Sequence, residues 1–454
     1  MKTINNLLAV IFIACFMTLL TGQRLTAQNT EYSRLGATGF SIGAKGYIGT
    51  GCTYLNGVFT AKKDFWEYDP ATDSWTQKAD LGGVAREAAT GFSIENLGYI
   101  GTGVGGNWLN DFWEYNPAQN KWTIKANFGG PARENAVGFS LGKKGYIGTG
   151  YVYMNGLLNN LKDFWEFTPS SGNGKGTWKR VADLPGNPRY AAVAFGIGQK
   201  AIIATGINYV DSEHYTFYKD CWEYDPNTNP KTGGKWTQKT DLPAVSRAFA
   251  VGFSINGTKG YIGTGNSGKA QEGFKKDFWE YDPGNLTTGP WTRKADFPGR
   301  ARDCDVGFAI GNKGYIGLGL AGASYDTLAQ DFWQFDPGTI PGGLGTWLQM
   351  ADFGLHRGLL KDAASSEISD QLSNEELIVY PNPSNSTFNF SLKTTSEELV
   401  TIQIFDMLGR LLHEYKSLSP DDVMTVKDIL NVGVYFAVVT QGEYRKTIKL
   451  SKVN

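Results

Sequence analysis

One aromatic, acidic heptapeptide occurs six times along the 454-residue chain, and this repetition constrains the fold more than any other feature. Its first form is DFWEYDP, and every copy keeps the aspartate at its start, the tryptophan two places later and the closing proline. Regular self-similarity of this kind is typical of repeat proteins, which use one supersecondary unit several times. The six copies begin at Asp64, Asp111, Asp163, Asp220, Asp277 and Asp331.

The heptapeptide is part of a longer repeat. A glycine-rich GYIGTG segment, or a variant of it, precedes each copy, and a single tryptophan follows each copy. An arginine opens each unit, and successive arginines are 52, 47, 56, 58 and 55 residues apart. The arginines are Arg34, Arg86, Arg133, Arg189, Arg247 and Arg302, and the tryptophans are Trp75, Trp122, Trp178, Trp236, Trp291 and Trp347.

Each unit contains four segments of strand length, written in one repeat as GFSI, YIGTG, DFWEY and WTQKADL and bounded by Gly, Pro and Asp. A single four-stranded sheet cannot bury both of its faces, so six of them must stack, and radial closure also protects their edges. We therefore expect an all-β, six-bladed β-propeller in which each blade is one repeat and no strand is borrowed across the closure. The repeated tryptophans are then core residues.

Residues from about 30 to 353 resemble a kelch-repeat propeller of the kind found in the central domain of galactose oxidase. The resemblance rests on the glycine-rich second strand, the Asp-x-Trp-x-Tyr/Phe strand and the tryptophan that follows it. The adjacent glycine pair of the family is replaced here by Thr-Gly, as in Thr50-Gly51, which indicates a divergent subtype. We expect the propeller to span residues 28–353.

The two ends of the chain differ from the repeats. Lys2 precedes an apolar run from Leu7 to Leu20, and this pattern predicts a secretory signal peptide over residues 1–27, cleaved near Ala27. Its apolar core is short for a membrane span, and we expect no transmembrane segment in the mature chain. A polar stretch over residues 354–378 is expected to be a linker.

Alternating apolar residues and Asn-Pro or Gly turns predict a small C-terminal β-sandwich over residues 379–454. This segment resembles the C-terminal sorting domain of the type IX secretion system. The resemblance implies contact with that machinery, passage through the periplasm, and a secreted or outer-surface location in a Gram-negative, Bacteroidetes-type bacterium, usually with removal of the domain. Its marks are Tyr380-Pro381-Asn382-Pro383, Asp406, Gly409-Arg410, Gly433-Val434-Tyr435 and Lys449.

Composition excludes several functions. A formal net charge of −1 gives no basic field for nucleic acid. The mature chain keeps three cysteines, Cys52, Cys221 and Cys304, so at most one disulfide can form. The copper site of galactose oxidase needs two histidines, yet of the three in this chain only His214 falls in a propeller loop. We expect no metal and no cofactor.

The candidate ligand-binding residues are the six arginines and the aromatic residues of the loops between second and third strands. Because each arginine stands just before an innermost strand, we expect all six to circle one mouth of the axial channel. Arginine forks beside exposed aromatic rings suit carboxylates, sugars or an acidic peptide. The aromatic candidates are Tyr54, Trp108, Tyr153, Tyr209 and Tyr215.

Two questions stay open at this point. The arginines could instead be structural, paired with Glu87, Glu134 and Asp303 or with acids of the heptapeptide, because a residue present in every repeat usually serves the repeat. The function could be recognition of a glycan or protein, carbohydrate chemistry or a structural surface role. An enzyme would resemble sialic acid mutarotases, with Arg133 holding a carboxylate and Glu134 moving protons, or galactose oxidase without its copper.

Overall fold

The structure is a computed structural model of the chain, and it forms two compact units, residues 1–364 and 365–454, which are described separately. The predicted signal peptide and most of the predicted linker lie outside the described residues. Among the described residues there is no helix long and apolar enough to cross a bilayer. The described residues are 30–354 and 376–452, without 155–156, 170–173, 212, 269–272, 286, 288, 323, 339–341, 381–386, 394–397, 407–410, 420–423, 427–429, 432 and 442–443.

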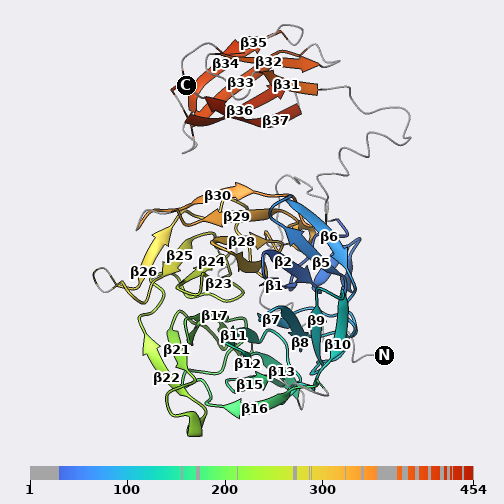
Figure 1. The fold of residues 1–454 in the computed structure, drawn as a ribbon, viewed down its shortest axis with the longest axis vertical. Coiled ribbons are helices and arrows are strands. Elements are labelled where there is room, and N and C mark those ends of the chain that lie inside the picture. The colour runs from blue at the N-terminus through green and yellow to red at the C-terminus, as the bar shows by residue number, and fades with distance from the viewer. Residues whose placement is uncertain are drawn as a thin grey trace. The chain divides into compact units, whose positions relative to one another are not determined.

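The first unit is a six-bladed β-propeller (Figure 1). Each blade is a four-stranded antiparallel sheet whose strands follow chain order from the axis outward. Blade one consists of β1 (Thr38–Ile42), β2 (Lys45–Gly49), β5 (Phe65–Asp69) and β6 (Ser74–Lys78). Blade two consists of β7 (Thr90–Ile94), β8 (Leu97–Gly101), β9 (Phe112–Asn116) and β10 (Lys121–Ile124). Blade three consists of β11 (Val137–Leu141), β12 (Lys144–Gly148), β15 (Phe164–Thr168) and β16 (Thr177–Val181). Blade four consists of β17 (Val193–Ile197), β18 (Lys200–Ala204), β21 (Cys221–Asp225) and β22 (Lys235–Lys239). Blade five consists of β23 (Val251–Ile255), β24 (Lys259–Gly263), β25 (Phe278–Tyr281) and β26 (Trp291–Lys294). Blade six consists of β27 (Val306–Ile310), β28 (Lys313–Gly317), β29 (Phe332–Asp336) and β30 (Thr346–Gln349).

The propeller closes without exchanging a strand, as the repeat predicts. The innermost strands β1, β7, β11, β17, β23 and β27 contact one another in chain order, and β27 returns to contact β1. Each of the six sheets takes all its strands from one repeat. Contacts between blades one and six, such as the bond from Thr30 Oγ1 to Gln330 Oε1 at 2.6 Å, therefore hold the ring closed.

The repeated tryptophans of the outermost strands join neighbouring blades. Each indole Nε1–H donates to a backbone carbonyl of the preceding blade, at 2.9–3.1 Å. The bond from Trp75 to the carbonyl of Ala351 does the same across the closure. These tryptophans are thus structural, in agreement with the prediction that they belong to the core. The donor–acceptor pairs are Trp75–Ala351, Trp122–Ala79, Trp178–Ala126, Trp236–Ala182, Trp291–Thr240 and Trp347–Ala295.

Glycine in the second strand makes room for the neighbouring blade. A Cβ atom on Gly260 would lie 1.9 Å from Cε2 of Phe195, which projects from the innermost strand of blade four. Blade four is the irregular one, because Ile202 and Cys221 replace the Tyr and Phe whose rings stack in other blades, as Tyr47 and Phe65 do at 5.5 Å. Cys221 is fully buried, so it replaces the Phe within the core.

Small hairpins extend the loops between second and third strands in three blades. They are β3 (Cys52–Leu55) with β4 (Val58–Ala61), β13 (Tyr151–Met154) with β14 (Leu157–Asn160), and β19 (Ile207–Tyr209) with β20 (Tyr215–Phe217). Two 3-10 turns, Pro230–Thr232 and Tyr325–Thr327, lie in blades four and six.

The second unit is a small β-sandwich, as predicted. Its two sheets share one core that includes Phe388, Ile402, Val439 and Leu450. One sheet has the order β31 (Glu376–Tyr380), β32 (Phe388–Lys393), β35 (Met424–Val426); the other has the order β34 (Leu411–Leu418), β33 (Val400–Asp406), β36 (Gly433–Gln441), β37 (Tyr444–Lys452).

Candidate functional site

The six repeated arginines lie inside the blades. Arg133 donates from Nη1 and Nη2 to the two carboxylate oxygens of Asp163, each at 2.7 Å. Its Nη1 also donates to the carbonyl of Thr149 at 2.8 Å, and Nε donates to the carbonyl of Pro131 at 3.1 Å. All six arginine side chains are at most 1% exposed. The pairs are Arg34–Asp64, Arg86–Asp111, Arg133–Asp163, Arg189–Asp220, Arg247–Asp277 and Arg302–Asp331.

This geometry corrects the predicted arginine ring at the channel mouth. The forks bind the first aspartate of the heptapeptide in their own blade, and Glu134 and its counterparts are not their partners. Burial alone would raise the pKa of Asp163, but the fork from Arg133 and the indole of Trp165 outweigh it and hold that pKa below its ordinary value. Because the forks are already occupied, we leave all six arginines out of the candidate site.

A closed ring of backbone hydrogen bonds defines the mouth of the channel. It is formed by the residue two places after each arginine, which has a left-handed backbone with φ between 51° and 61°. Each ring N–H donates to the ring carbonyl of the preceding blade, as Asn135 does to Ala88 at 3.0 Å, and Gly36 closes the ring onto Cys304 at 3.2 Å. We call this set the mouth ring. Its members are Gly36, Ala88, Asn135, Ala191, Phe249 and Cys304.

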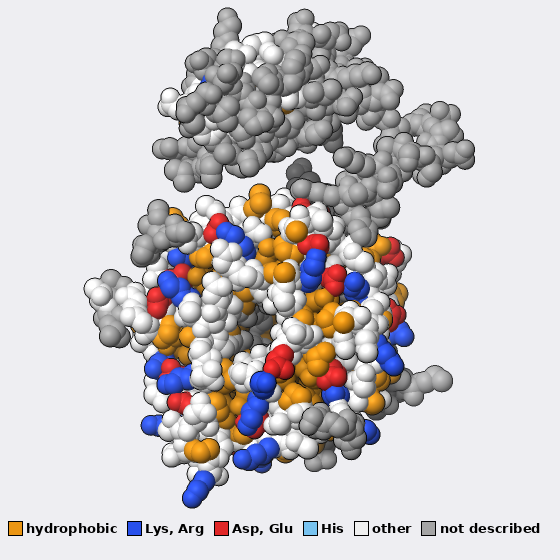
Figure 2. Space-filling view, viewed as in Figure 1, with side chains coloured by type: hydrophobic (Ala, Val, Ile, Leu, Met, Phe, Trp, Pro, Cys, Tyr) orange, Lys and Arg blue, Asp and Glu red, His pale blue; other side chains and the backbone are white. Residues whose placement is uncertain are grey.

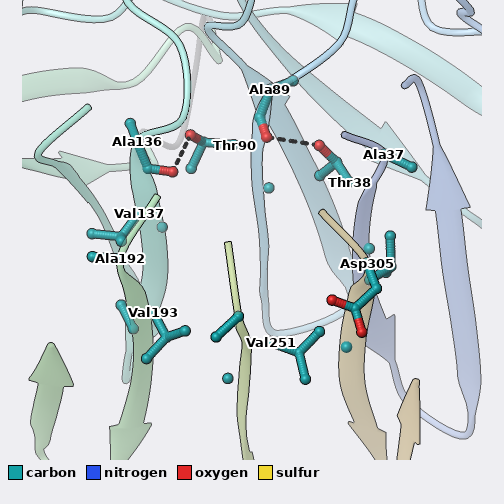
Figure 3. Close-up of a pocket in the computed structure, with 18 residues that line it drawn as sticks. Ala37, Thr38, Ala89, Thr90, Ala136, Val137, Ala192, Val193, Val251 and Asp305 are labelled. Carbon is teal, nitrogen blue, oxygen red and sulfur yellow. Dashed lines mark hydrogen bonds between the residues drawn. The ribbon is translucent and has the colours of Figure 1, made fainter. Parts of the chain in front are cut away.

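Below the mouth ring, small residues line the axial channel (Figure 3), and a hollow is visible at the propeller's centre in Figure 2. The cavity has a volume of about 170 Å³. Five blades place alanine next to the mouth ring, whereas blade six places Asp305 there, the one ionisable side chain among the described lining residues. Its Oδ1 accepts a bond from Thr264 Oγ1 at 3.0 Å, and Oδ2 has no partner among the described residues. Burial raises its pKa well above the ordinary value, although the charge of Arg302 acts in the opposite direction.

The residue directly after each arginine joins the channel mouth to the surface loops. In every blade it forms a two-bond antiparallel bridge with the start of the loop that follows the second strand; Glu134 and Tyr151, for example, exchange bonds of 3.1 and 3.2 Å. Unlike the arginine, this residue changes from blade to blade. In chain order it is Leu35, Glu87, Glu134, Tyr190, Ala248 and Asp303.

The three acids at this position and Asp305 are each next to a member of the mouth ring in the sequence, and we call the four carboxyl groups the mouth cluster. The charge of Glu134 raises the pKa of Glu87 and of Tyr190, and that of Glu87 raises the pKa of Cys304, so titratable groups of four blades influence one another. Burial raises the pKa of Glu134 to about 7, even though Tyr151 and Trp108 donate to it.

The other two acids of the mouth cluster are shifted in the same direction. Burial and the charge of Glu134 raise the pKa of Glu87 to about 8. Burial raises the pKa of Asp303 to about 7, against hydrogen bonds from the Asn266 amide, at 3.1 Å, and the Cys304 thiol. Carboxyl groups whose pKa lies near neutrality are a feature of binding and catalytic sites.

Of the predicted aromatic residues, Trp108 and Tyr153 lie beside the mouth cluster. Their rings stack at 5.9 Å with an interplanar angle of 14°, and Trp108 Nε1 donates to Glu134 Oε1 at 3.1 Å. Both side chains are half-buried, so part of each ring faces solvent. Tyr54 forms a separate aromatic group with Phe59, at 4.6 Å.

The last two aromatic candidates divide between core and surface. Tyr209 is buried and packs with Tyr151 and Tyr190, whereas Tyr215 is 47% exposed on β20. His214, near the hairpin tip, is exposed and bonded to Asp211. Among the described residues no group of three or more His, Cys, Asp or Glu is placed to hold a metal ion.

The mouth cluster should make the propeller less stable as the pH rises. Between the ordinary carboxyl pKa of about 4 and the raised values near 7 to 8, the folded state retains protons that the unfolded state has lost, so stability falls in this window. The propeller should therefore lose free energy of unfolding between about pH 5 and pH 8. Replacing Glu134 by Leu, the residue of blade one, should make this loss smaller by roughly 2 kcal/mol. Denaturant unfolding at the two pH values measures this, and equal losses in both proteins would contradict it.

Comparison with known proteins agrees with both units. Residues 378–453 match the family described as secretion system C-terminal sorting domain. A solved structure titled "Structure of YjhT" is similar to this chain at a TM-score of 0.54 and 17% sequence identity, over 70% of this chain and 99% of that one. No curated protein sequence matches the chain. The sorting domain implies export to the cell surface or medium of a Bacteroidetes-type bacterium. The chain thus folds into a six-bladed β-propeller followed by a segment that matches the secretion system C-terminal sorting domain family.

Proposed function

We propose that the protein is an exported glycan-binding module whose ligand site is the loop-bearing mouth of the axial channel. The observation that carries the proposal is the stacked pair of Trp108 and Tyr153 held against the buried carboxyl of Glu134. A flat aromatic face packs on the apolar face of a sugar ring, and carboxyl oxygens accept hydrogen bonds from sugar hydroxyls. Binding sites commonly combine such apolar surfaces with a few converging polar groups.

The sequence pattern of the repeat supports the same location. Residues that are identical in every blade, such as the arginines, stabilise the fold of each blade. The mouth cluster and the pair Trp108–Tyr153 differ from blade to blade, so the requirements of the fold do not explain them. Loop residues that a scaffold positions but does not need for packing are the usual carriers of function.

Removing the aromatic pair should abolish most glycan binding. We expect Trp108→Ala and Tyr153→Ala each to weaken binding by about tenfold or more, since an aromatic stacking contact of roughly 1.4 kcal/mol corresponds to that factor. A glycan array followed by calorimetry on the full chain measures this. Ile124→Ala, an exposed residue on the outer strand of blade two, is the matched control and should bind as the wild type does. Equal binding by all four proteins would contradict the proposal.

An enzyme acting on a carbohydrate is the second candidate, and the raised pKa values favour it. Glu87 and Glu134, with pKa values of about 8 and 7, are suited to exchanging protons near neutral pH. The role predicted for Arg133 is no longer open, because Asp163 occupies its fork. Exchange of sugar anomers followed by NMR, with the wild type and Glu134→Gln, separates the two functions. Turnover lost in the variant indicates an enzyme, whereas binding without turnover indicates the module.

A further inference from the structure

Three carboxyl oxygens at the mouth accept no hydrogen bond from the described residues. They are Oε2 of Glu134, Oδ1 of Asp303 and Oδ2 of Asp305. Glu134 and Asp303 are 2% and 6% exposed, so ordinary solvation does not compensate for the missing donors. A buried acceptor without a partner lowers stability, and such groups in a folded protein usually have a functional explanation. The repeat does not require these acids, because Leu35 and Ala248 replace them in other blades.

Among the described residues, basic side chains do not neutralise these acids. No lysine or arginine among the described residues acts on the carboxyl groups of Glu87, Glu134 or Asp303. Arg302 acts on Asp305, but its fork is held by Asp331 at 2.5 and 2.8 Å. A ligand with carboxylate or sulfate groups would therefore meet repulsion at this mouth, whereas a ligand rich in donors, or positively charged, would meet acceptors.

This inference rests on the proposed glycan-binding function and names its ligand class. We infer that the ligand is an amino sugar, a saccharide with a free ammonium group, whose ring packs on Trp108 and Tyr153 and whose ammonium faces the unpartnered Oε2 of Glu134, the acid to which Trp108 donates. An ammonium group has three donors and no acceptor, which complements a set of acceptor oxygens. When it binds, carboxyl groups that still hold a proton ionise and release that proton to the buffer. Proton release is thus a signature of this ligand class.

The repeat itself supplies substitutions that the backbone accepts. Asp305→Ala installs the residue that five other blades have at this place. Glu134→Leu and Asp303→Ala install the residues of blades one and five. All three variants should fold, and their thermal unfolding midpoints verify this before binding is measured.

The test is calorimetry of the full chain at about pH 6.5 with oligosaccharides of glucosamine, N-acetylglucosamine and glucuronic acid. We expect the glucosamine oligomer to bind about 10- to 100-fold more tightly than its acetylated counterpart, as charge-assisted bonds allow. The binding heat should vary with the ionisation heat of the buffer in the direction of proton release. Glu134→Leu should remove most of this preference, while Ile124→Ala should keep it.

The outcomes separate this inference from the function on which it rests. If binding depends on Trp108 but does not favour the ammonium form, the inference is wrong and the binding module stands. If no oligosaccharide binds any of the proteins, both fail. A lysine-rich peptide that binds more tightly than the glucosamine oligomer, through the same acids, would overturn the amino sugar in favour of a protein ligand.

Discussion

Replacing Arg133 with alanine should lower the free energy of unfolding by about 3–5 kcal/mol, the range measured when one partner of a buried ion pair is removed. Arg133 is fully buried, and Asp163 beside it is only 13% exposed. The substitution leaves that carboxylate with the indole of Trp165 as its one remaining side-chain donor among the described residues. It also leaves the carbonyls of Thr149 and Pro131 without the guanidinium donors that they have now.

Arg180→Ala is the matched control for this prediction. Arg180 forms an ion pair with Asp183 on the same blade, but its side chain is 58% exposed, and exposed pairs contribute at most about 1 kcal/mol. Arg133→Lys should fall between the two, because an ammonium cannot form the paired bonds of the guanidinium fork. Denaturant unfolding followed by tryptophan fluorescence measures all three. A loss for Arg133→Ala as small as that for Arg180→Ala would refute the structural role.

Replacing Trp75 with alanine should cost about 3–5 kcal/mol, as for other large-to-small changes in a core. Trp75 is fully buried between the first and last blades, where its ring contacts Phe332 at 5.0 Å and Phe353 at 4.9 Å. Its indole also donates to the carbonyl of Ala351 at 3.0 Å across the closure. No strand crosses this junction, so such side-chain contacts and a few backbone bonds, such as that from Gly36 to Cys304, hold the ring closed.

Two further variants separate packing from hydrogen bonding at the closure. Trp75→Phe keeps an aromatic ring and loses the bond to Ala351, so we expect a loss of about 1–2 kcal/mol. Trp178→Ala removes the equivalent side chain between blades two and three, where it is half-buried, and should cost less than Trp75→Ala. Thermal and denaturant unfolding of the three variants provide the comparison. An equal loss in the free energy of unfolding for Trp75→Ala and Trp178→Ala would mean that the tryptophan at the closure contributes no more to stability than its equivalent between blades two and three.

The architecture could be predicted from the sequence because six copies of a segment restrict the possible folds much more than one copy does. A single DFWEY segment is compatible with several folds, but six copies at a regular spacing leave few arrangements that bury all of them. The sorting domain could be predicted for a different reason, since its marks occur in order within one short segment. The expected signal peptide and linker remain predictions.

The arginine ring could not be placed correctly because sequence position does not determine where a long side chain points. A residue just before an inner strand can turn toward the axis or back into its own blade. The partner was nevertheless visible, because the first aspartate of the heptapeptide is as constant as the arginine. Constancy of both residues indicates a structural pair.

The mouth cluster was not identified from the sequence because its residues vary from repeat to repeat. Glu87 and Asp303 were considered only as partners of the arginines, Glu134 also as the proton-moving acid of an enzyme, and Asp305 was not considered at all. The signal that could have identified them is departure from the repeat, since Asp305 stands where five blades have alanine. The hairpin candidates Tyr209 and Tyr215 show a related limit, because one is buried and the other exposed on the same small hairpin.

Arg133 and its neighbour Glu134 provide the most direct test of the account, because one is assigned to the fold and the other to the ligand. The measurement is the thermal unfolding midpoint of Arg133→Ala and Glu134→Leu, with and without the glycan that the wild type binds; ligand at about 100 times its Kd stabilises by roughly 2.7 kcal/mol. We predict that Arg133→Ala unfolds at a lower temperature and keeps the ligand-induced shift, whereas Glu134→Leu keeps or raises its midpoint and loses the shift. The reverse pattern would contradict the division between a structural arginine and a functional mouth.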